Sequence, residues 1–167
     1  MKRCAWCNLN NPKYIEYHDH EWGKLNTDEE YLFEMLILES FQAGLSWQCI
    51  LNKREAFKEA YEDFDIDKVI EFDEEKIEQL RNNPNIIRNK LKIKASISNA
   101  KIFKSIQEEY QTFYDYLCTF THGQIIYETE KTTSALSDSI SNDLKKRGMK
   151  FVGSTIIYSY LQAIGVI

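Results

Sequence analysis

The stretch Tyr31-Leu-Phe-Glu-Met-Leu-Ile-Leu-Glu39 predicts a helix that carries a carboxylate inside its own apolar stripe. At about 100° per residue, Leu32, Met35 and Leu36 share one face of this helix. Glu39 projects only about 20° from Leu32, so it lies within that face. Burying a carboxylate costs desolvation energy, and the negative end of the helix dipole opposes it as well. Glu39 therefore needs a partner or a function, unless the helix end frays and the side chain reaches water.

The helix is expected to span residues 27–41. Thr27-x-x-Glu30 is a capping-box pattern, in which two side chains bind free backbone N–H groups at a helix start. Glu30 and Glu34 lie on the face opposite to the apolar stripe.

Length and composition indicate a globular protein. A chain of 167 residues with 43% hydrophobic residues fits one domain, or two small lobes that share a core. We find no N-terminal signal segment and no apolar run of membrane-spanning length. Four cysteines in this setting suggest reduced thiols or metal ligands. We therefore expect a cytoplasmic protein without a membrane partner.

The net charge of −5 argues mildly against a nucleic-acid partner, but the basic residues are segregated. Seven bases and no acid occur in residues 79–107, and four more bases without an acid follow Asp143. Such segregation can create a basic face for a phosphate backbone on an acidic protein. The alternative is a solvated face of lysine-rich helices.

Periodicity and turn residues predict an all-α chain. Beyond the first helix, we expect helices at 47 to about 62, at two short segments starting with Asp65 and Asp73, and at 85–110, 113–120, 137–147 and 154–164. Ser46 can cap the second of these helices. Residues 124–133 include the strand-like Ile125-Ile126-Tyr127, but no partner strand is near, so we interpret them as a loop.

A tight turn, Gly148-Met-Lys-Phe-Val-Gly153, joins the last two expected helices. A hairpin of this kind leaves backbone N–H groups unpaired at the start of the next helix, where a DNA phosphate can bind. Four cations surround it: Lys145, Lys146, Arg147 and Lys150. The alternative is an ordinary turn between two helices.

Aromatic residues are dense near the N-terminus, where Trp6, Tyr14, Tyr17 and Trp22 occur. In addition, Trp47 and Glu39 flank the Gly44-Leu45 turn, which can bring an indole and a carboxylate to one pocket. Aromatic rings that stack on a base, together with one hydrogen-bond acceptor, suit the binding of an extruded base. The ring faces and the carboxylate both favour a base that is cationic. The alternative is that these aromatics fill the core.

Several motifs occur in a fixed order along the chain: Arg3-Cys4-Ala5-Trp6, Tyr17-His18-Asp19-x-Glu21-Trp22-Gly23, Leu32-Phe33-Glu34-Met35, Leu38-Glu39, Gln42-Ala43-Gly44-Leu45-Ser46-Trp47, Ile86-Ile87-Arg88-x-x-x-Lys92-Ile93 and Leu144-Lys-Lys-Arg-Gly-Met-Lys-Phe-Val-Gly153. Together they resemble the DNA-3-methyladenine glycosylase I family, over nearly the whole chain. The resemblance implies an all-α helix-hairpin-helix DNA glycosylase fold, with two helical lobes around a base-binding pocket. Residues 1–167 would form one glycosylase domain, with the helix-hairpin-helix element at about 137–165.

The resemblance also implies the activity. A member of this family flips N3-methyladenine out of alkylated double-stranded DNA and hydrolyses its bond to deoxyribose. Glu39 and Tyr17 would form the catalytic pair that hydrogen-bonds the base, Trp47 would stack on it, and the pocket would be lined by Trp6, Tyr14 and Trp22. Gly44-Leu45 matches the turn that enters the duplex. Gly148 and Gly153 would frame the phosphate contact, together with the four cations around the hairpin.

The charge of the substrate explains why little acid catalysis is needed. An alkylated adenine is already cationic and leaves as a neutral base, so the chemistry requires no cofactor. Related enzymes place a catalytic Asp beyond the hairpin, whereas this chain has no acid after Asp143. We therefore predict poor activity on neutral damaged bases. No lysine follows Lys150, which argues against a Schiff-base lyase step.

The family's structural zinc joins Cys4 and His18 to a His and a Cys in a C-terminal tail. This sequence ends at Ile167, before that tail, and two ligands rarely hold structural zinc. Cys7 could add a third ligand, and His20 is nearby. We therefore expect only a partial zinc site.

Two other classes of protein compete with a monomeric repair enzyme. A thiol oxidoreductase built on Cys4-Ala-Trp-Cys7 would need a βαβ context, which the helical pattern denies. A non-enzymatic helix-hairpin-helix DNA-binding module would not need a carboxylate among tryptophans. Release of free N3-methyladenine from methylated DNA separates the three.

Overall fold

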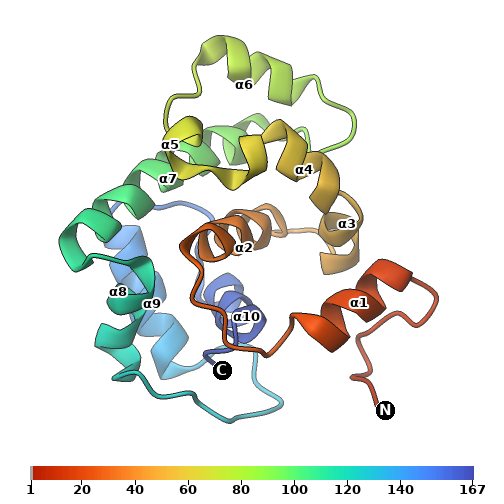
Figure 1. The fold of residues 1–167 in the computed structure, drawn as a ribbon, viewed down its shortest axis with the longest axis vertical. Coiled ribbons are helices and arrows are strands. Elements are labelled where there is room, and N and C mark those ends of the chain that lie inside the picture. Colours follow the sequence, from red (N-terminus) through yellow and green to blue (C-terminus); the bar gives the residue numbers. More distant parts are fainter. Residues whose placement is uncertain (1) are drawn as a thin grey trace.

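The computed structural model describes residues 2–167, and these contain helices but no strand, which confirms the all-α prediction. The helices, shown in Figure 1, are α1 (Pro12–His20), α2 (Glu29–Phe41), α3 (Trp47–Asn52), α4 (Arg54–Ala60), the 3₁₀ helix η1 (Glu62–Phe64), α5 (Ile66–Val69), α6 (Glu74–Arg81), α7 (Lys90–Tyr110), α8 (Phe113–Thr121), α9 (Ala135–Lys146) and α10 (Ser154–Ala163). Within the described residues, no helix is both long and apolar enough to cross a membrane.

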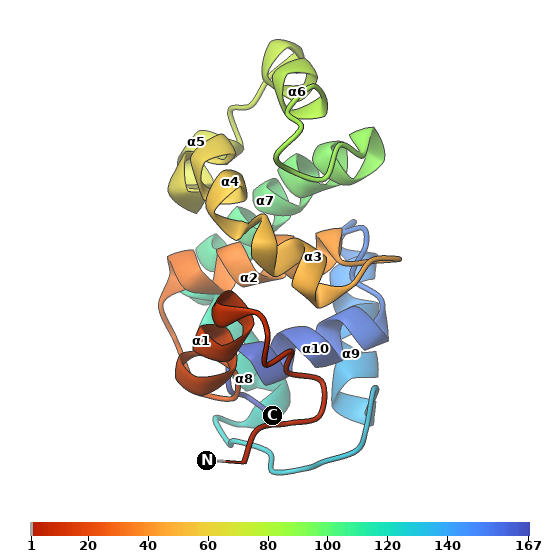
Figure 2. The same cartoon turned by 90° about the vertical axis from the view of Figure 1, so that its right-hand side faces the viewer.

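Helix α2 lies at the centre of the fold and is buried on every side over residues 32–41. Figures 1 and 2 show α4, α5, α6 and α7 on one side of it, and α1, α8, α9 and α10 on the other. Helix α2 packs directly against α7, α8 and α10. The two groups of helices form lobes that share α2, so the site residues on α2 lie at the junction of the lobes.

Two details of α2 differ from the prediction. Asp28, not Thr27, is the N-cap, and its carboxylate accepts from the Tyr31 N–H at 3.2 Å. Glu34 is buried although it lies opposite the apolar stripe, because Arg54 of α4 binds it at 2.8 Å. Arg54 also binds Glu21 at 2.8 Å. The partner of Glu34 comes from another helix, so the periodicity of α2 alone could not reveal it.

The helix expected over residues 47–62 is two helices. Lys53 leaves the helical region with φ −101° and ψ 1°, which separates α3 from α4. Beyond α4, Glu62 has a φ of 54°, so the chain turns there. The long basic helix begins at Lys90, not at residue 85, because the Asn89 side chain caps it by accepting from the Lys92 N–H at 3.1 Å.

Helix α1 was not predicted, although the sequence carries its start signals. The Asn11 side chain accepts from the Lys13 N–H at 3.1 Å, and Pro12 occupies the first helical position. The predicted caps Ser46, Asp65 and Asp73 are confirmed.

Residues 124–133 form a loop, as predicted. The loop is fixed to the C-terminal segment by a hydrogen bond from the Ile126 N–H to the Val166 carbonyl, at 2.9 Å. It leads into α9, whose N-terminus is closed by a capping box between Ser134 and Ser137.

Candidate active site

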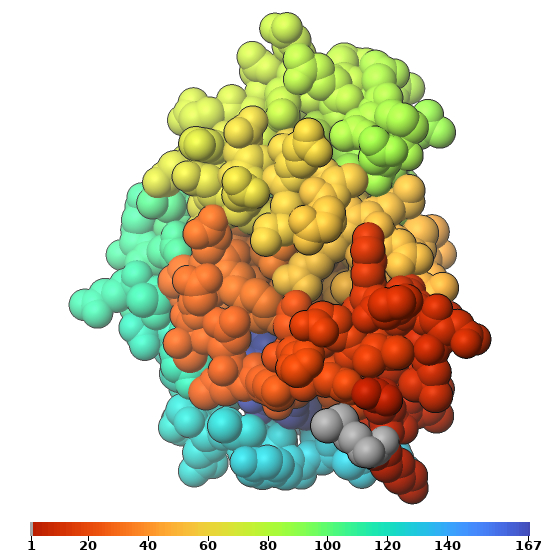
Figure 3. Space-filling view, turned by 45° about the vertical axis from the view of Figure 1, so that its right-hand side comes forward, coloured from red at the N-terminus to blue at the C-terminus, as the bar shows by residue number. Residues whose placement is uncertain are grey.

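The aromatic N-terminal segment (residues 4–22), α2, α3, α10 and the loop at 124–133 surround a cavity of about 700 Å³. Figure 3 shows the N-terminal segment lying between α2 to α4 on one side and this loop on the other. The cavity is lined by Cys4, Ala5, Trp6, Tyr14, Tyr17, Trp22, Glu39, Gln42, Trp47, Glu128, Thr129, Glu130, Lys131, Ser159 and Gln162. All six residues that the sequence assigned to base binding or catalysis therefore face one space.

Glu39 lies in the last turn of α2 and is only 3% exposed. Its Oε2 atom has no hydrogen-bond partner among the described residues. Burial raises the pKa of Glu39 to about 8, because the ionised form loses its hydration. The carboxyl group is therefore mostly protonated at neutral pH, until a cation enters the cavity and favours its ionised form.

Trp47 lines the same cavity and also carries a buried polar atom. It is the first residue of α3, and Ser46 caps that helix by accepting from the Cys49 N–H at 3.1 Å. The Trp47 Nε1 atom has no hydrogen-bond partner among the described residues. Buried polar groups are nearly always paired, so an orphaned donor and an orphaned carboxyl oxygen at one cavity point to a polar ligand.

Helix α1 supplies the aromatic wall of the cavity. Tyr14 and Tyr17 are three residues apart on this helix and both are buried. The Tyr17 ring lies 5.3 Å from the Trp47 ring, and the Trp6 ring lies 5.6 Å from Tyr14 and 5.0 Å from Trp22. Burial and the neighbouring Glu39 raise the pKa of Tyr17 well above its ordinary value. Tyr17 therefore keeps its proton and can donate a hydrogen bond.

Several residues that line the cavity were not predicted as pocket residues. Gln42 follows Glu39 by three positions, so helical spacing could have indicated it. Ser159 and Gln162 are likewise three apart on α10. Residues 128–131 belong to the loop, and no periodic pattern marks the side chains of a loop as lining residues.

The Gly44-Leu45 turn directly follows the end of α2. Gly44 has a φ of +79°, which a glycine adopts without strain. Leu45 is 41% exposed. Leu45 thus exposes an apolar side chain, and in the sequence it lies between the cavity residues Gln42 and Trp47. This is the arrangement expected of a turn that enters the duplex beside the base.

The hairpin between α9 and α10 is a tight turn with a glycine at each end. Gly148 has a φ of +103°, and the Met149 N–H returns to the Leu144 carbonyl at 3.0 Å. Gly153 is the N-cap of α10, and no side chain caps this helix. The first N–H groups of α10 are therefore free to bind an anion. The side chains of Lys145, Lys146 and Lys150 are exposed around the turn.

Arg147 differs from these three lysines because it is bound within the protein. Its guanidinium contacts Asp143 and Glu109, each at 2.8 Å, and lies 5.3 Å from the centre of the Tyr116 ring. These contacts compete with the phosphate contact that the sequence suggested for Arg147. They favour a structural role for this residue.

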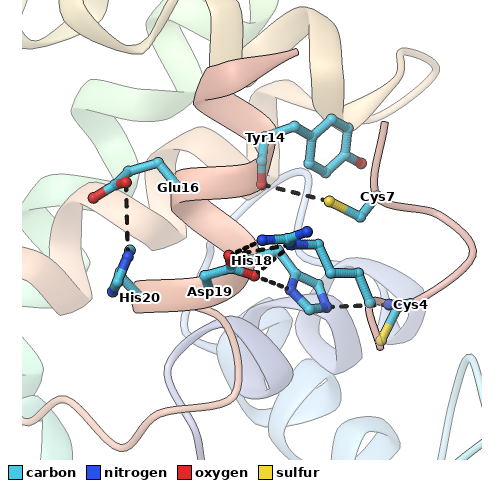
Figure 4. A network of polar contacts seen from close by, with 8 residues as sticks. Cys4, Cys7, Tyr14, Glu16, His18, Asp19 and His20 are labelled. Carbon is cyan, nitrogen blue, oxygen red and sulfur yellow. Dashed lines mark hydrogen bonds and ion pairs between the residues drawn. The ribbon is translucent and has the colours of Figure 1, made fainter. Parts of the chain in front are cut away.

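The predicted metal ligands Cys4 and His18 lie next to each other (Figure 4). The Cys4 N–H donates to His18 Nε2 at 3.3 Å, and His18 Nδ1 donates to Asp19 at 2.9 Å. The Nε2 lone pair therefore accepts the Cys4 N–H, and a metal ion bound at Nε2 would have to replace this contact.

The two further candidates for the metal site are turned away. The Cys7 thiol donates to the Tyr14 carbonyl at 3.8 Å, and His20 lies 3.8 Å from Glu16. No group of three or more His, Cys, Asp or Glu residues that could hold a metal ion occurs in residues 2–167. Cys4 and His18 are therefore two neighbouring candidate ligands without a third in the described part of the chain, and the expectation of a partial zinc site stays a prediction.

Comparison with known proteins supports the family resemblance seen in the sequence. The methyladenine glycosylase family matches residues 6–167. The chain is 43% identical to DNA-3-methyladenine glycosylase 1 of Escherichia coli (strain K12) over 174 residues, which cover 100% of this chain and 92% of that protein. It is 36% identical to DNA-3-methyladenine glycosylase of Haemophilus influenzae (strain ATCC 51907 / DSM 11121 / KW20 / Rd), covering 99% and 92%.

Solved structures lead to the same family. A 3-methyladenine DNA glycosylase I from Staphylococcus aureus superimposes with a TM-score of 0.92 at 36% identity, covering 99% of this chain and 91% of that one. A variant of 3-methyladenine DNA glycosylase I in complex with 3-methyladenine gives a TM-score of 0.93 at 35% identity, covering 99% and 92%. The resemblance seen in the sequence is confirmed, and the chain belongs to the methyladenine glycosylase family.

Proposed function

We propose that this protein is a DNA-3-methyladenine glycosylase that removes N3-methyladenine from alkylated double-stranded DNA. The observation that carries the proposal is the pair of orphaned polar atoms, Glu39 Oε2 and Trp47 Nε1, at one aromatic cavity. A cationic methylated adenine supplies the positive charge that the Glu39 carboxylate lacks. It also supplies a flat π-surface for the rings.

Binding selects the extruded base through charge. N3-methyladenine in DNA is cationic, and its entry favours the ionised form of Glu39, so a neutral adenine gains less from the same cavity. Tyr17, which keeps its proton, donates a hydrogen bond to a ring nitrogen. Trp47 stacks on the base, while Trp6, Tyr14 and Trp22 exclude water around it.

Bond cleavage then follows from the charge of the base. The bond between the base nitrogen and the C1′ carbon breaks, and its electron pair neutralises the leaving base. The sugar passes through an oxocarbenium-like transition state, a water oxygen adds to C1′, and one proton leaves to solvent. Asp143, the last acid of the chain, is bound to Arg147 and Tyr116, so it is not available as a base in this reaction. The chemistry requires no cofactor and no lysine.

The hairpin between α9 and α10 and the Gly44-Leu45 turn bind the DNA. Phosphate oxygens accept from the first N–H groups of α10, and Lys145, Lys146 and Lys150 neutralise the backbone. The Gly44-Leu45 turn enters the duplex beside the extruded nucleotide. All six base-binding residues come from one chain, so the proposed site needs no residue of a second copy.

Release of free base from methylated duplex DNA, resolved by chromatography, tests the proposal. We expect release of 3-methyladenine, little release of neutral damaged bases such as hypoxanthine, and no strand cleavage by a lyase step. A protein that binds the duplex but releases no base would instead be a DNA-binding module. The orphaned atoms in the cavity argue against that alternative, because DNA binding alone does not need them.

A further inference from the structure

Lys92 is a buried cation of α7 that binds the end of a different helix. It is 8% exposed, and its Nζ donates to the Phe41 carbonyl at 3.0 Å and to the Ala43 carbonyl. These carbonyls belong to the C-terminal end of α2 and to the residue before Gly44. Helix α2 has no basic residue in its own last turn, so Lys92 supplies the cation that this helix end favours.

Asn99, seven residues after Lys92 on α7, binds the hairpin between α9 and α10. Asn99 is 1% exposed, its Nδ2 donates to the Lys150 carbonyl at 2.9 Å, and its Oδ1 accepts from the Lys150 N–H at 3.0 Å. Lys92 Nζ itself lies 6.0 Å from the centre of the Phe151 ring. Helix α7 therefore contacts both the duplex-entering turn and the phosphate-binding hairpin.

Helix geometry fixes the offset between these two contacts. Seven residues bring the chain to within about 20° of two full turns, so Lys92 and Asn99 lie on the same face. They are separated by a rise of roughly 10 Å. Both lie inside a continuous helix of 21 residues, so this separation cannot change without breaking the helix.

We propose that Lys92 is a positioning residue for base extrusion, which together with Asn99 makes α7 a rigid spacer between the Gly44-Leu45 turn and the hairpin. This inference rests on the proposed function, in which the hairpin binds the backbone and the turn enters the duplex. Once the hairpin holds a phosphate, the turn already stands at the nucleotide to be extruded, and no loop has to be ordered. Lys92 is buried against backbone carbonyls and does not line the base cavity, so it acts through the turn.

Lys92→Met, which removes the amine and keeps the side-chain length, tests the inference. We expect single-turnover excision from methylated duplex DNA to fall roughly tenfold or more, because a small displacement of a positioning element has a large effect on rate. Binding of free 3-methyladenine and affinity for unmodified duplex should stay at the wild-type level. A merely structural role would instead reduce excision, binding of the free base and affinity for unmodified duplex together.

A double-mutant cycle with Leu45→Ala decides whether Lys92 acts through the turn. If it does, Lys92→Met should cost little further excision once Leu45 is truncated, because coupled residues are not additive. Additive losses, or an equal loss of free-base binding, would overturn the inference.

Two further variants complete the experiment. Lys104→Met removes the same charge from α7, where Lys104 is half-exposed and pairs with Asp67 at 3.1 Å, and should excise at the wild-type rate. If Lys92→Met does not fold, Lys92→Gln takes its place in the cycle, since its shorter side chain cannot reach both carbonyls. Absence of base release by the wild type contradicts the proposed function, whereas normal release with additive losses contradicts only the role of Lys92.

Discussion

Burial raises the pKa of Glu39 to about 8 in the folded chain, whereas the value in the unfolded chain is near 4.5. The folded protein therefore holds this proton more tightly than the unfolded chain does. Between these values the folded state binds more protons, so Glu39 lowers stability increasingly as the pH rises from 4.5 to 8. Above pH 8 the loss is complete and is on the order of 5 kcal/mol. The binding site is thus maintained at the expense of stability.

Glu39→Gln should therefore stabilise the fold, and the gain should depend on pH. Little difference from the wild type is expected near pH 4.5, and a gain of a few kcal/mol is expected above pH 8. Urea unfolding at several pH values measures it. Glu34→Gln is the matched control, since it breaks a buried ion pair with Arg54 and should destabilise the protein. A gain that is equal at all pH values would show that Glu39 does not titrate as described.

Binding of a cationic base should release a proton from Glu39. Below pH 8 the group must ionise to accept the cation, so the affinity for a 3,9-dialkyladeninium probe should rise with pH and level off near pH 8. The increase is at most about tenfold per pH unit. Calorimetric titration in buffers of different ionisation enthalpy detects the released proton, and Glu39→Gln should abolish both effects. A flat affinity profile for the wild type would refute the assignment.

Trp47→Ala should weaken binding of free 3-methyladenine by roughly 1–3 kcal/mol, because the variant has no ring at this position to stack on the base. Quenching of tryptophan fluorescence by the base measures this change. Trp47→Phe keeps a smaller aromatic ring that can still stack on the base, so its affinity should lie between those of Trp47→Ala and the wild type. Equal binding by all three proteins would exclude Trp47 from the site.

In the hairpin between α9 and α10, Lys145, Lys146 and Lys150 are exposed, whereas Arg147 is bound within the protein. Replacing Lys146 and Lys150 by Ala should weaken DNA binding and flatten its salt dependence, by a slope of about 0.9 for each phosphate that is no longer neutralised. Arg147→Ala is the internal comparison. It should lower thermal stability more than it changes the slope, because Arg147 is bound to Asp143 and Glu109. An unchanged slope in the lysine variant would mean that the hairpin does not bind phosphate.

Most elements that carry a local signal were predicted from the sequence. The caps Ser46, Asp65 and Asp73 and the two-glycine hairpin lie where the sequence indicated them. The break at Lys53 was missed, because the apolar spacing continues across it while the backbone does not. Helix α1 was missed although Asn11-Pro12 indicates its start.

Contacts between distant segments were beyond a reading of single helices. The burial of Glu34 depends on Arg54, and the lining of the cavity by residues 128–131 depends on how a loop crosses the molecule. Likewise, the basic stretch of residues 79–107 contains cations with quite different roles. Lys92 binds backbone carbonyls and Lys104 pairs with Asp67, so neither contributes fully to an exposed basic face.

At the scale of the whole molecule, two lobes that share the buried helix α2 explain how a small chain can hold a dry carboxyl group. Helix α3, next to α2, contributes Trp47, and the lobe of α1, α8, α9 and α10 contributes the aromatic residues of α1 and the polar residues of α10. Helix α7 contacts both the turn after α2 and the hairpin between α9 and α10. The segments proposed to bind the DNA backbone and to enter the duplex beside the base cavity are therefore held by one helix. Recognition of the base therefore depends on the relative placement of elements from all parts of the sequence.

The most direct measurement compares the rates at which the wild type and Glu39→Gln release 3-methyladenine from methylated duplex DNA, at equal enzyme and with the fold verified by circular dichroism. The variant has no carboxylate to stabilise the cationic base and the positive sugar, so its rate should fall roughly 10²-fold or more while it stays folded. Release by Glu39→Gln at the wild-type rate would contradict the central claim that a buried carboxyl group in an aromatic cavity recognises the damaged base.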